Sequence, residues 1–346
     1  MYKTVQYGGF CFWQKNCSMG LQISWISRLA LRRLLMIRRL MALLLVVCFY
    51  PTMSYANYQM YVSMNNDTIV TYDISPGSSS AIAASAKTFA NTNLSLPNGL
   101  VFDSSGNLYA ANGGTNTISK FNSSGVFQSS IGQGSLSGPT TGLLFDTSGN
   151  LYVSDYFGNK ITKFNSSGVF QFSFGSSANL DLPNGLAFDN SSNIFVANGR
   201  MNSIAKFDSL GVFQTSFGSS ANLSRPGGVV IDNLGNLYTA NYDSSTISKF
   251  NSSGVFQSFL GSGFLNKPNG LAFDSLGNLY VANDGSKTIS KFGPAGNFLL
   301  SWNTVSNPRF IVFAPAPVPE PSSFVLLGFA ILAAGCGKRF SRFCKI

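Results

Sequence analysis

The chain has 346 residues, enough for two ordinary domains, and its 23 Lys and Arg outnumber its 13 Asp and Glu. Eleven of the basic residues and all five Cys lie before residue 57 or after residue 335, so the body between them is neutral, with twelve basic residues against twelve Asp. This distribution excludes disulfides and thiolate ligands in the body, and it argues against nucleic acid as a partner, because a surface that neutralises phosphates must be basic.

The first 56 residues have the layout of an export signal. Two arginines precede the apolar run 40–50, and the small residues Ser54 and Ala56 follow at the spacing of a cleavage site. An eleven-residue helix is about 17 Å long, too short for a hydrocarbon core of about 30 Å, which disfavours a permanent anchor. We therefore interpret 1–56 as a signal peptide, with 1–35 as an extension upstream of the true start.

The body repeats itself with a period of about 43 residues. The aligned glycines are Gly99, Gly142, Gly185, Gly228 and Gly270. Within one period, residues 99–103, 107–112, 117–121 and 125–131 are rich in β-branched, aromatic and aliphatic side chains and end in Gly, Asn, Asp or Ser, as expected for four antiparallel strands with tight turns. Four strands per period are typical of a propeller blade. A β-solenoid is the less favoured alternative, because its rungs are usually shorter.

The ends of the body determine the number of blades. Residues 58–62 and 68–72 match the second and third strands of a period, and 308–313 match a first strand. These two partial units complete one another, so five whole repeats and one shared blade predict an all-β, six-bladed propeller over residues 57–314. Pairing of the N- and C-terminal strands would close the ring and remove its open edges.

The pattern Pro-x-Gly, then Asp, Gly-Asn, Tyr-Val-Ala-Asn and Ile-x-Lys-Phe resembles NHL repeats. The chain departs from many members of that family in two ways: Asn replaces Asp at the end of most second strands, and a lysine occupies a strand position that is usually apolar. The lysines are Lys120, Lys163, Lys206, Lys249 and Lys291. We expect them to lay their aliphatic stems along the blade faces.

The residue types of the body disfavour catalysis. The chain contains no His, the commonest general base and metal ligand, and its only Glu, Glu320, lies in the tail. Lyases on similar propellers, such as the streptogramin type and the amidating-enzyme lyase domain, rely on histidines, and gluconolactonase-like relatives bind a cation through Glu, Asn and Asp. We expect no cofactor, and only weak binding of any divalent cation.

One set of polar residues is the candidate ligand cluster at a channel mouth. Its members end the second strands or directly follow them: Asn112, Asp155, Asn198, Asn241, Asn283, Asp243 and Asp284, with Arg200 nearby. A residue that recurs in every blade is more often structural, and hydrogen bonding between neighbouring blades is the favoured role of the Asn ring. A weak cation or sugar site is the alternative. Asp103 and its equivalents beside the hairpin loops are expected to be structural.

Residues 315–346 form a three-part tail. Val318, Pro319, Glu320 and Pro321 precede the apolar run 324–335, and four basic residues follow. This order resembles the PEP-CTERM sorting signal, which implies processing by an exosortase-type membrane protease in a Gram-negative-type bacterium that makes extracellular polysaccharide. The run would form a short transmembrane helix before processing. A plain C-terminal anchor is the alternative.

Together these features favour an exported, non-enzymatic interaction protein at the cell surface or in the extracellular matrix. Its expected partners are extracellular polysaccharide or other secreted proteins, besides the sorting protease. The alternatives are a cation-assisted lyase or lactonase with its site at the channel mouth, and a small-ligand sensor or carrier.

Overall fold

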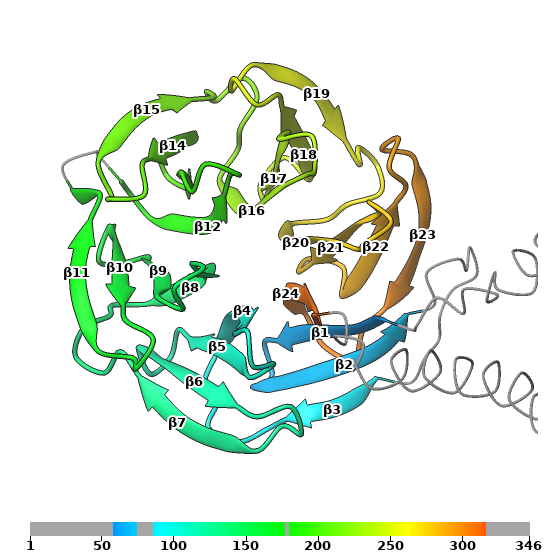
Figure 1. Ribbon diagram of the computed structural model, residues 1–346. Coiled ribbons are helices and arrows are strands. Elements are labelled where there is room, and N and C mark those ends of the chain that lie inside the picture. The colour runs from blue at the N-terminus through cyan, green and yellow to red at the C-terminus, as the bar shows by residue number, and fades with distance from the viewer. Residues whose placement is uncertain (1–57, 75–85, 177–179, 316–346) are drawn as a thin grey trace, which may run out of the picture. The chain divides into compact units, whose positions relative to one another are not determined.

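The computed structural model describes residues 58–74, 86–176 and 180–315. These residues form six four-stranded antiparallel sheets, arranged as blades around a central axis (Figure 1). The predicted six-bladed propeller is confirmed. The described part of the chain contains no helix that could cross a membrane. The expected signal peptide with Ser54 and Ala56, the sorting residues 318–321 and the expected C-terminal helix lie outside the described residues.

Blades 1 to 3 contain the following strands, given from the axis outward. Blade 1 consists of β24 (Pro308–Phe313), β1 (Tyr58–Met64), β2 (Thr68–Ile74) and β3 (Lys87–Ala90). Blade 2 consists of β4 (Pro97–Phe102), β5 (Leu108–Asn112), β6 (Thr117–Phe121) and β7 (Phe127–Ile131). Blade 3 consists of β8 (Pro139–Phe145), β9 (Leu151–Asp155), β10 (Lys160–Phe164) and β11 (Phe170–Phe174).

Blades 4 to 6 follow the same order. Blade 4 consists of β12 (Pro183–Phe188), β13 (Ile194–Asn198), β14 (Ser203–Phe207) and β15 (Phe213–Phe217). Blade 5 consists of β16 (Pro226–Ile231), β17 (Leu237–Asn241), β18 (Thr246–Phe250) and β19 (Phe256–Leu260). Blade 6 consists of β20 (Pro268–Phe273), β21 (Leu279–Asn283), β22 (Thr288–Phe292) and β23 (Phe298–Asn303).

The hydrophobic core lies between the blades. Each second strand from β5 to β21 is buried along its whole length, because both of its faces pack against a neighbouring blade. One such cluster joins Tyr109 and Ile118 of blade 2 to Leu143 and Phe164 of blade 3. The outermost strands are largely exposed. Burial between blades therefore explains why the second strands are almost entirely apolar.

Blade 1 closes the ring by joining the two ends of the propeller. Strands β1 and β24 pair antiparallel, with Tyr61 opposite Val312 and Val62 opposite Ile311. In the adjacent loops, the Ser306 hydroxyl donates a 2.6 Å hydrogen bond to Oδ1 of Asn65. The predicted pairing of N- and C-terminal strands is confirmed, and it makes blade 1 a complete four-stranded sheet like the other five.

Glycines let the innermost strands approach one another closely near the axis. A Cβ atom on Gly99 of β4 would lie 2.6 Å from the carbonyl oxygen of Thr140 in β8. A Cβ atom on Gly228 of β16 would likewise lie 2.6 Å from the carbonyl oxygen of Asn269 in β20. The glycine of the Pro-x-Gly motif is thus needed because neighbouring backbones come into contact there.

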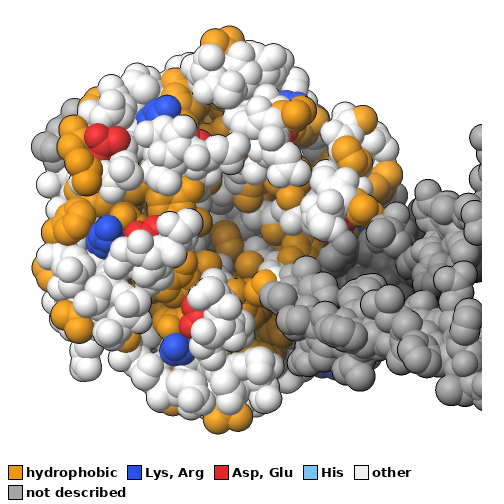
Figure 2. Space-filling view, in the orientation of Figure 1, with side chains coloured by type: hydrophobic (Ala, Val, Ile, Leu, Met, Phe, Trp, Pro, Cys, Tyr) orange, Lys and Arg blue, Asp and Glu red, His pale blue; other side chains and the backbone are white. Residues whose placement is uncertain are grey.

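The repeated lysines and aspartates form one structural unit in each of blades 2 to 6. Lys120 Nζ lies 5.1 Å from the ring centroid of Tyr109 and 3.4 Å from Oδ2 of Asp103. Oδ1 of Asp103 in turn accepts a 2.8 Å hydrogen bond from the backbone N–H of Asn107, which stabilises the hairpin turn. Figure 2 shows basic and acidic side chains lying side by side on several blades around a central hollow. The repeated Lys and Asp side chains therefore stabilise their own blade.

Candidate functional site

A cavity of about 250 Å³ opens at one mouth of the central channel. We call it the funnel. All six blades contribute a residue from the start of their innermost strand, between the Pro and Gly of the motif or at the equivalent place: Asn98, Thr140, Asn184, Gly227, Asn269 and Arg309. The repeat thus places one residue per blade around the axis. Most of these residues are small or neutral polar, which suits a ligand rich in hydroxyl groups.

A second group of lining residues comes from the loops that follow the second strands. Tyr156 and Phe157 follow β9, and Tyr242 follows β17. The rings of Tyr156 and Phe157 pack edge to face with centroids 5.0 Å apart, yet Phe157 is 69% exposed. An apolar ring this exposed offers a stacking surface beside the polar residues of the funnel.

The residue before the motif proline has an unusual backbone conformation. Leu96, Leu182, Arg225 and Lys267 all have φ between 48° and 55° there, in the left-handed region that is costly for residues with a side chain. Arg225, with φ of 50°, is the member of this group whose side chain adds charge to the funnel lining.

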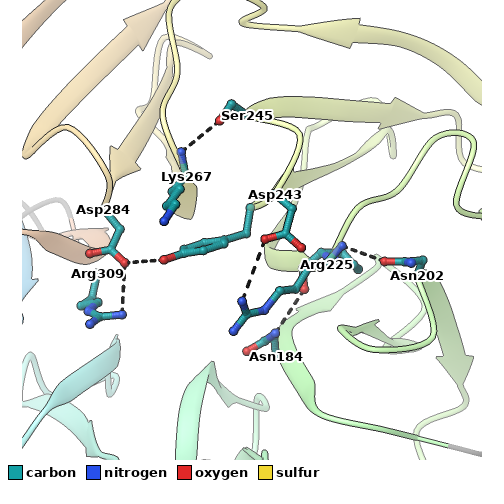
Figure 3. A network of polar contacts seen from close by, with 10 residues as sticks. Asn184, Asn202, Arg225, Asp243, Ser245, Lys267, Asp284 and Arg309 are labelled. Carbon is teal, nitrogen blue, oxygen red and sulfur yellow. Dashed lines mark hydrogen bonds and ion pairs between the residues drawn. The ribbon is translucent and has the colours of Figure 1, made fainter.

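Each of these strained residues is held by a polar side chain of the preceding blade. The backbone N–H of Arg225 donates a 2.7 Å hydrogen bond to Oδ1 of Asn202 (Figure 3). The same contact joins Leu96 to Asp67, Gly138 to Asn116, Leu182 to Asn159 and Lys267 to Ser245. The interblade hydrogen bond offsets part of the strain and fixes the direction in which the side chain leaves the backbone.

Arg225 is only loosely paired. Its Nη1 lies 3.9 Å from Oδ1 of Asp243, and both side chains are more than half exposed. The guanidinium also lies 5.0 Å from the ring centroid of Tyr242. Burial acts to lower the pKa of Arg225, but a hydrogen bond with Tyr156 and the nearby Asp243 outweigh it, so the pKa is raised. Arg225 therefore stays cationic with N–H donors directed toward the funnel.

Arg309 is tightly paired by contrast. Its Nη1 lies 3.2 Å from Oδ2 of the buried Asp284, which also accepts a 2.9 Å hydrogen bond from the Tyr242 hydroxyl. Asn307 Nδ2 donates to the backbone carbonyl of Asp284. Burial, and then the contact with Asp284, raise the pKa of Tyr242, so its hydroxyl remains protonated and donates. This network holds Arg309 and Tyr242 in place.

The predicted Asn ring does not line the funnel. Asn112, Asp155, Asn198, Asn241 and Asn283 are at most 3% exposed. Their Oδ1 atoms accept hydrogen bonds from the backbone of the segment that leads in from the preceding blade, as in the 3.2 Å contact from Ser95 to Asn112. Nδ2 of Asn112 also donates to the Ser119 hydroxyl at 2.8 Å. These side chains therefore hold each connecting segment against its own blade.

The other predicted residues occupy different places. Asp284 and Asp243 lie on neighbouring blades near the mouth, and each faces an arginine. Arg200 is 3.7 Å from Asp181 and does not line the funnel. Among the described residues, no group of three or more His, Cys, Asp or Glu is arranged to hold a metal ion. The structure thus brings Asp243 and Asp284 together with arginines rather than with the Asn ring.

Asp155 differs from its four Asn equivalents. Its Oδ1 accepts a 2.6 Å hydrogen bond from the backbone N–H of Ser137, but Oδ2 is buried and has no hydrogen-bond partner among the described residues. Lys160 Nζ lies 3.7 Å away, at the position where blades 2, 5 and 6 have Thr. Burial raises the pKa of Asp155. The pair Asp155–Lys160 therefore replaces an Asn–Thr pair.

Sequence reasoning missed Arg225, Arg309, Tyr156 and Phe157. The available signal was the Pro-x-Gly motif, where two positions break the repeat. Arg309 directly follows the proline of its blade, and Arg225 directly precedes the proline of its blade. Tyr156 and Phe157 stand in a loop where blade 2 has two glycines. At these positions, the residues that depart from the repeat are ones that line the funnel.

Comparison with known proteins found matches for the C-terminal tail and for the fold of the propeller. Residues 317–339 match the family model of the PEP-CTERM protein-sorting motif. No curated protein matches the sequence. A chain in the crystal structure of a nidogen/laminin complex is 16% identical, with a TM-score of 0.66 over 75% of this chain and 98% of the other.

Two lyase structures have the same fold. A streptogramin B lyase is 15% identical, with a TM-score of 0.57 over 76% of this chain and 92% of the other. Virginiamycin B lyase from Staphylococcus aureus is also 15% identical, with a TM-score of 0.54 over 75% and 92%. At these identities the likeness shows the fold alone. The chain is therefore a six-bladed β-propeller protein that carries a PEP-CTERM protein-sorting motif at residues 317–339.

Proposed function

We propose that this protein is an exported, non-enzymatic interaction protein whose propeller binds extracellular polysaccharide through the funnel. The sorting motif at residues 317–339 implies export and sorting to the cell envelope by an exosortase-type system. In this proposal, the tail holds the protein in the inner membrane until it is processed. The body then functions at the surface or in the matrix of a Gram-negative-type bacterium.

The observation that carries the proposal is the chemistry of the funnel. Neutral amides from three blades (Asn98, Asn184 and Asn269) lie near an exposed aromatic ring, Phe157. Thr141 also lines the funnel, and its hydroxyl is buried and without a hydrogen-bond partner among the described residues. Amides and hydroxyls can pair with sugar hydroxyls, and an aromatic ring can stack on the apolar face of a sugar.

The same lining gives little support to the alternative of a cation-assisted lyase or lactonase. The body contains no His and no Glu. Two carboxylates close to the lining, Asp243 and Asp284, face its arginines Arg225 and Arg309. A general base needs a titrating group within hydrogen-bond reach of the substrate, and a hard cation needs several oxygen ligands that are not already paired with cations.

The test compares two exposed apolar residues. The full chain, purified in mild detergent, is titrated by calorimetry with exopolysaccharide from the producing bacterium. Phe157→Ser should weaken binding severalfold, because it removes the stacking surface. Leu210→Ser is the matched control: Leu210 is 76% exposed in a turn of blade 4, away from the funnel. Absence of saccharide binding, or equal loss in both variants, would overturn the proposal.

A further inference from the structure

The charge of the funnel lining is one-sided. Among its described lining residues, the charged ones are Arg225 and Arg309, and none is acidic. Arg225 comes from blade 5 and Arg309 from blade 1, and both line the funnel (Figure 3). A concave site lined by one sign of charge favours a ligand of the opposite sign.

The two arginines are not equivalent. Arg309 is neutralised at 3.2 Å by Asp284, a buried carboxylate that also accepts from Tyr242. Arg225 is 3.9 Å from Asp243, beyond hydrogen-bond distance, and that carboxylate is itself 56% exposed. Besides its hydrogen bond with Tyr156, the guanidinium of Arg225 thus keeps donors for a ligand, and a guanidinium can donate two parallel hydrogen bonds to one carboxylate.

Arg225 is also held in place before a ligand arrives. Its backbone lies at φ 50°, and the equivalent residue in blades 2 and 4 is an uncharged Leu at nearly the same φ, so the propeller does not need a cation there. The hydrogen bond from its backbone N–H to Asn202 fixes where the side chain leaves the backbone, and the contact of the guanidinium with the Tyr242 ring restricts the side chain itself. A side chain that is restricted before binding loses less conformational entropy when the ligand binds.

The funnel is small. Its volume of about 250 Å³ is below the roughly 300–1,000 Å³ of pockets for drug-sized ligands. It therefore suits one unit of a polymer, with the rest of the chain outside. We propose that the funnel recognises the carboxylate of an acidic sugar unit, with Arg225 as the residue that selects it. This inference rests on the proposed function and names its ligand class.

The experiment uses three probes with the full chain: trigalacturonate, its methyl ester, which lacks the charge, and acetate, which lacks the sugar. Trigalacturonate should bind about tenfold or more tightly than the ester, as expected for a hydrogen-bonded charge. Arg225→Leu should remove this preference, so that acid and ester bind with similar affinity. Its fold should be retained, because Leu182 occupies the equivalent position. Acetate should bind much more weakly than trigalacturonate.

Arg200→Leu is the matched control. It removes the same charge from an arginine that is exposed and outside the funnel, so it should bind trigalacturonate like the unmodified protein. Equal binding of acid and ester would overturn the inference and leave the proposed function standing. Equal weakening by Arg200→Leu and Arg225→Leu would show a general charge effect and would also overturn it. Failure of both trisaccharides to bind would count against the inference and, together with absent exopolysaccharide binding, against the proposed function.

Discussion

The backbone N–H of Arg225 donates a 2.7 Å hydrogen bond to the Asn202 side chain of the preceding blade, and this contact positions the loosely paired cation of the funnel. It is one of five equivalent contacts between successive blades, which join polar loop side chains to the residue before each motif proline. The same device thus links the blades of the propeller and orients the residues at its mouth.

Replacing Asn202 with Ala should weaken both functions of this contact. The free energy of unfolding is expected to fall by about 1–2 kcal/mol, because the strained residue loses its partner. Urea denaturation measures this change, and binding of trigalacturonate should weaken in parallel. Asn190→Ala, in an exposed turn of the same blade, is the control and should change neither quantity. Unaltered stability in Asn202→Ala would contradict the role of the contact.

Arg225→Gly should be more stable than Arg225→Leu, and both variants should lose the preference for the acidic sugar. A left-handed conformation costs an ordinary residue about 1–2 kcal/mol, and glycine avoids this cost but gains freedom in the unfolded chain. The net expectation is a gain of about 0.5–1 kcal/mol relative to Arg225→Leu, measured by urea denaturation. Blade 3 already has Gly138 at this position. If the Gly variant is no more stable than the Leu variant, the strain is not significant.

The double variant Asp155→Asn with Lys160→Thr should change how stability depends on pH. Burial raises the pKa of Asp155 above its ordinary value of 3.8. Folding therefore favours the protonated carboxyl. The ionised carboxyl destabilises the folded protein, and this penalty is absent below pH 3.8, grows as the pH rises toward the raised pKa and is fully present above it. The variant should be more stable than the unmodified protein at pH 7, with a difference that shrinks as the pH falls.

Unfolding by urea between pH 4 and pH 8 measures that difference. Carboxyls with lowered pKa, such as Asp103 and Asp232, are unchanged in the variant. Their loss of stability as the pH falls through their folded pKa values therefore cancels in the comparison. The new pair has a precedent in the 3.1 Å hydrogen bond from Asn241 to the Thr246 hydroxyl. A difference that is constant with pH would mean that Asp155 is ionised in both states.

Glu320→Ala tests the tail. The apolar run 324–335 corresponds to about 18 Å of helix, short of a hydrocarbon core of about 30 Å, so it suits transient rather than permanent anchoring. We expect native protein to lack residues beyond about Ser323, and the variant to stay uncleaved and membrane-held. Mass spectrometry of the mature C-terminus and membrane fractionation measure this, with Ser322→Ala as control. Mature protein that retains 343–346, unchanged by Glu320→Ala, would indicate a plain anchor.

Much of the fold could be predicted because its signals are local. The 43-residue period contains four strands and their turns, and the pairing within a blade joins segments that are neighbours in the sequence. Even the closure between β1 and β24 was readable, since residues 58–72 and 308–313 are complementary parts of one repeat. The motif in the tail is likewise a contiguous pattern.

The candidate site could be predicted only in part. The ends of the second strands were located correctly, but whether Asn112 points to the channel or to its own blade depends on the connecting segment that packs against it. Asp243 and Asp284 lie near the mouth, yet their pairing with Arg225 and Arg309 joins residues from loops and innermost strands. Successive side chains of a strand point to opposite faces, so a shift of one position changes which groups a side chain contacts. The repeat pattern does not show this direction.

By itself, the sequence determined the repeat, the number of blades and the sorting tail, because each depends on residues that follow one another along the chain. Only the tertiary structure decided which residues line the funnel. Asn98, Asn184, Arg225 and Arg309 meet there because the ring closes and brings the innermost strands of all six blades around one axis. That convergence arises from packing between blades, which a single repeat does not specify.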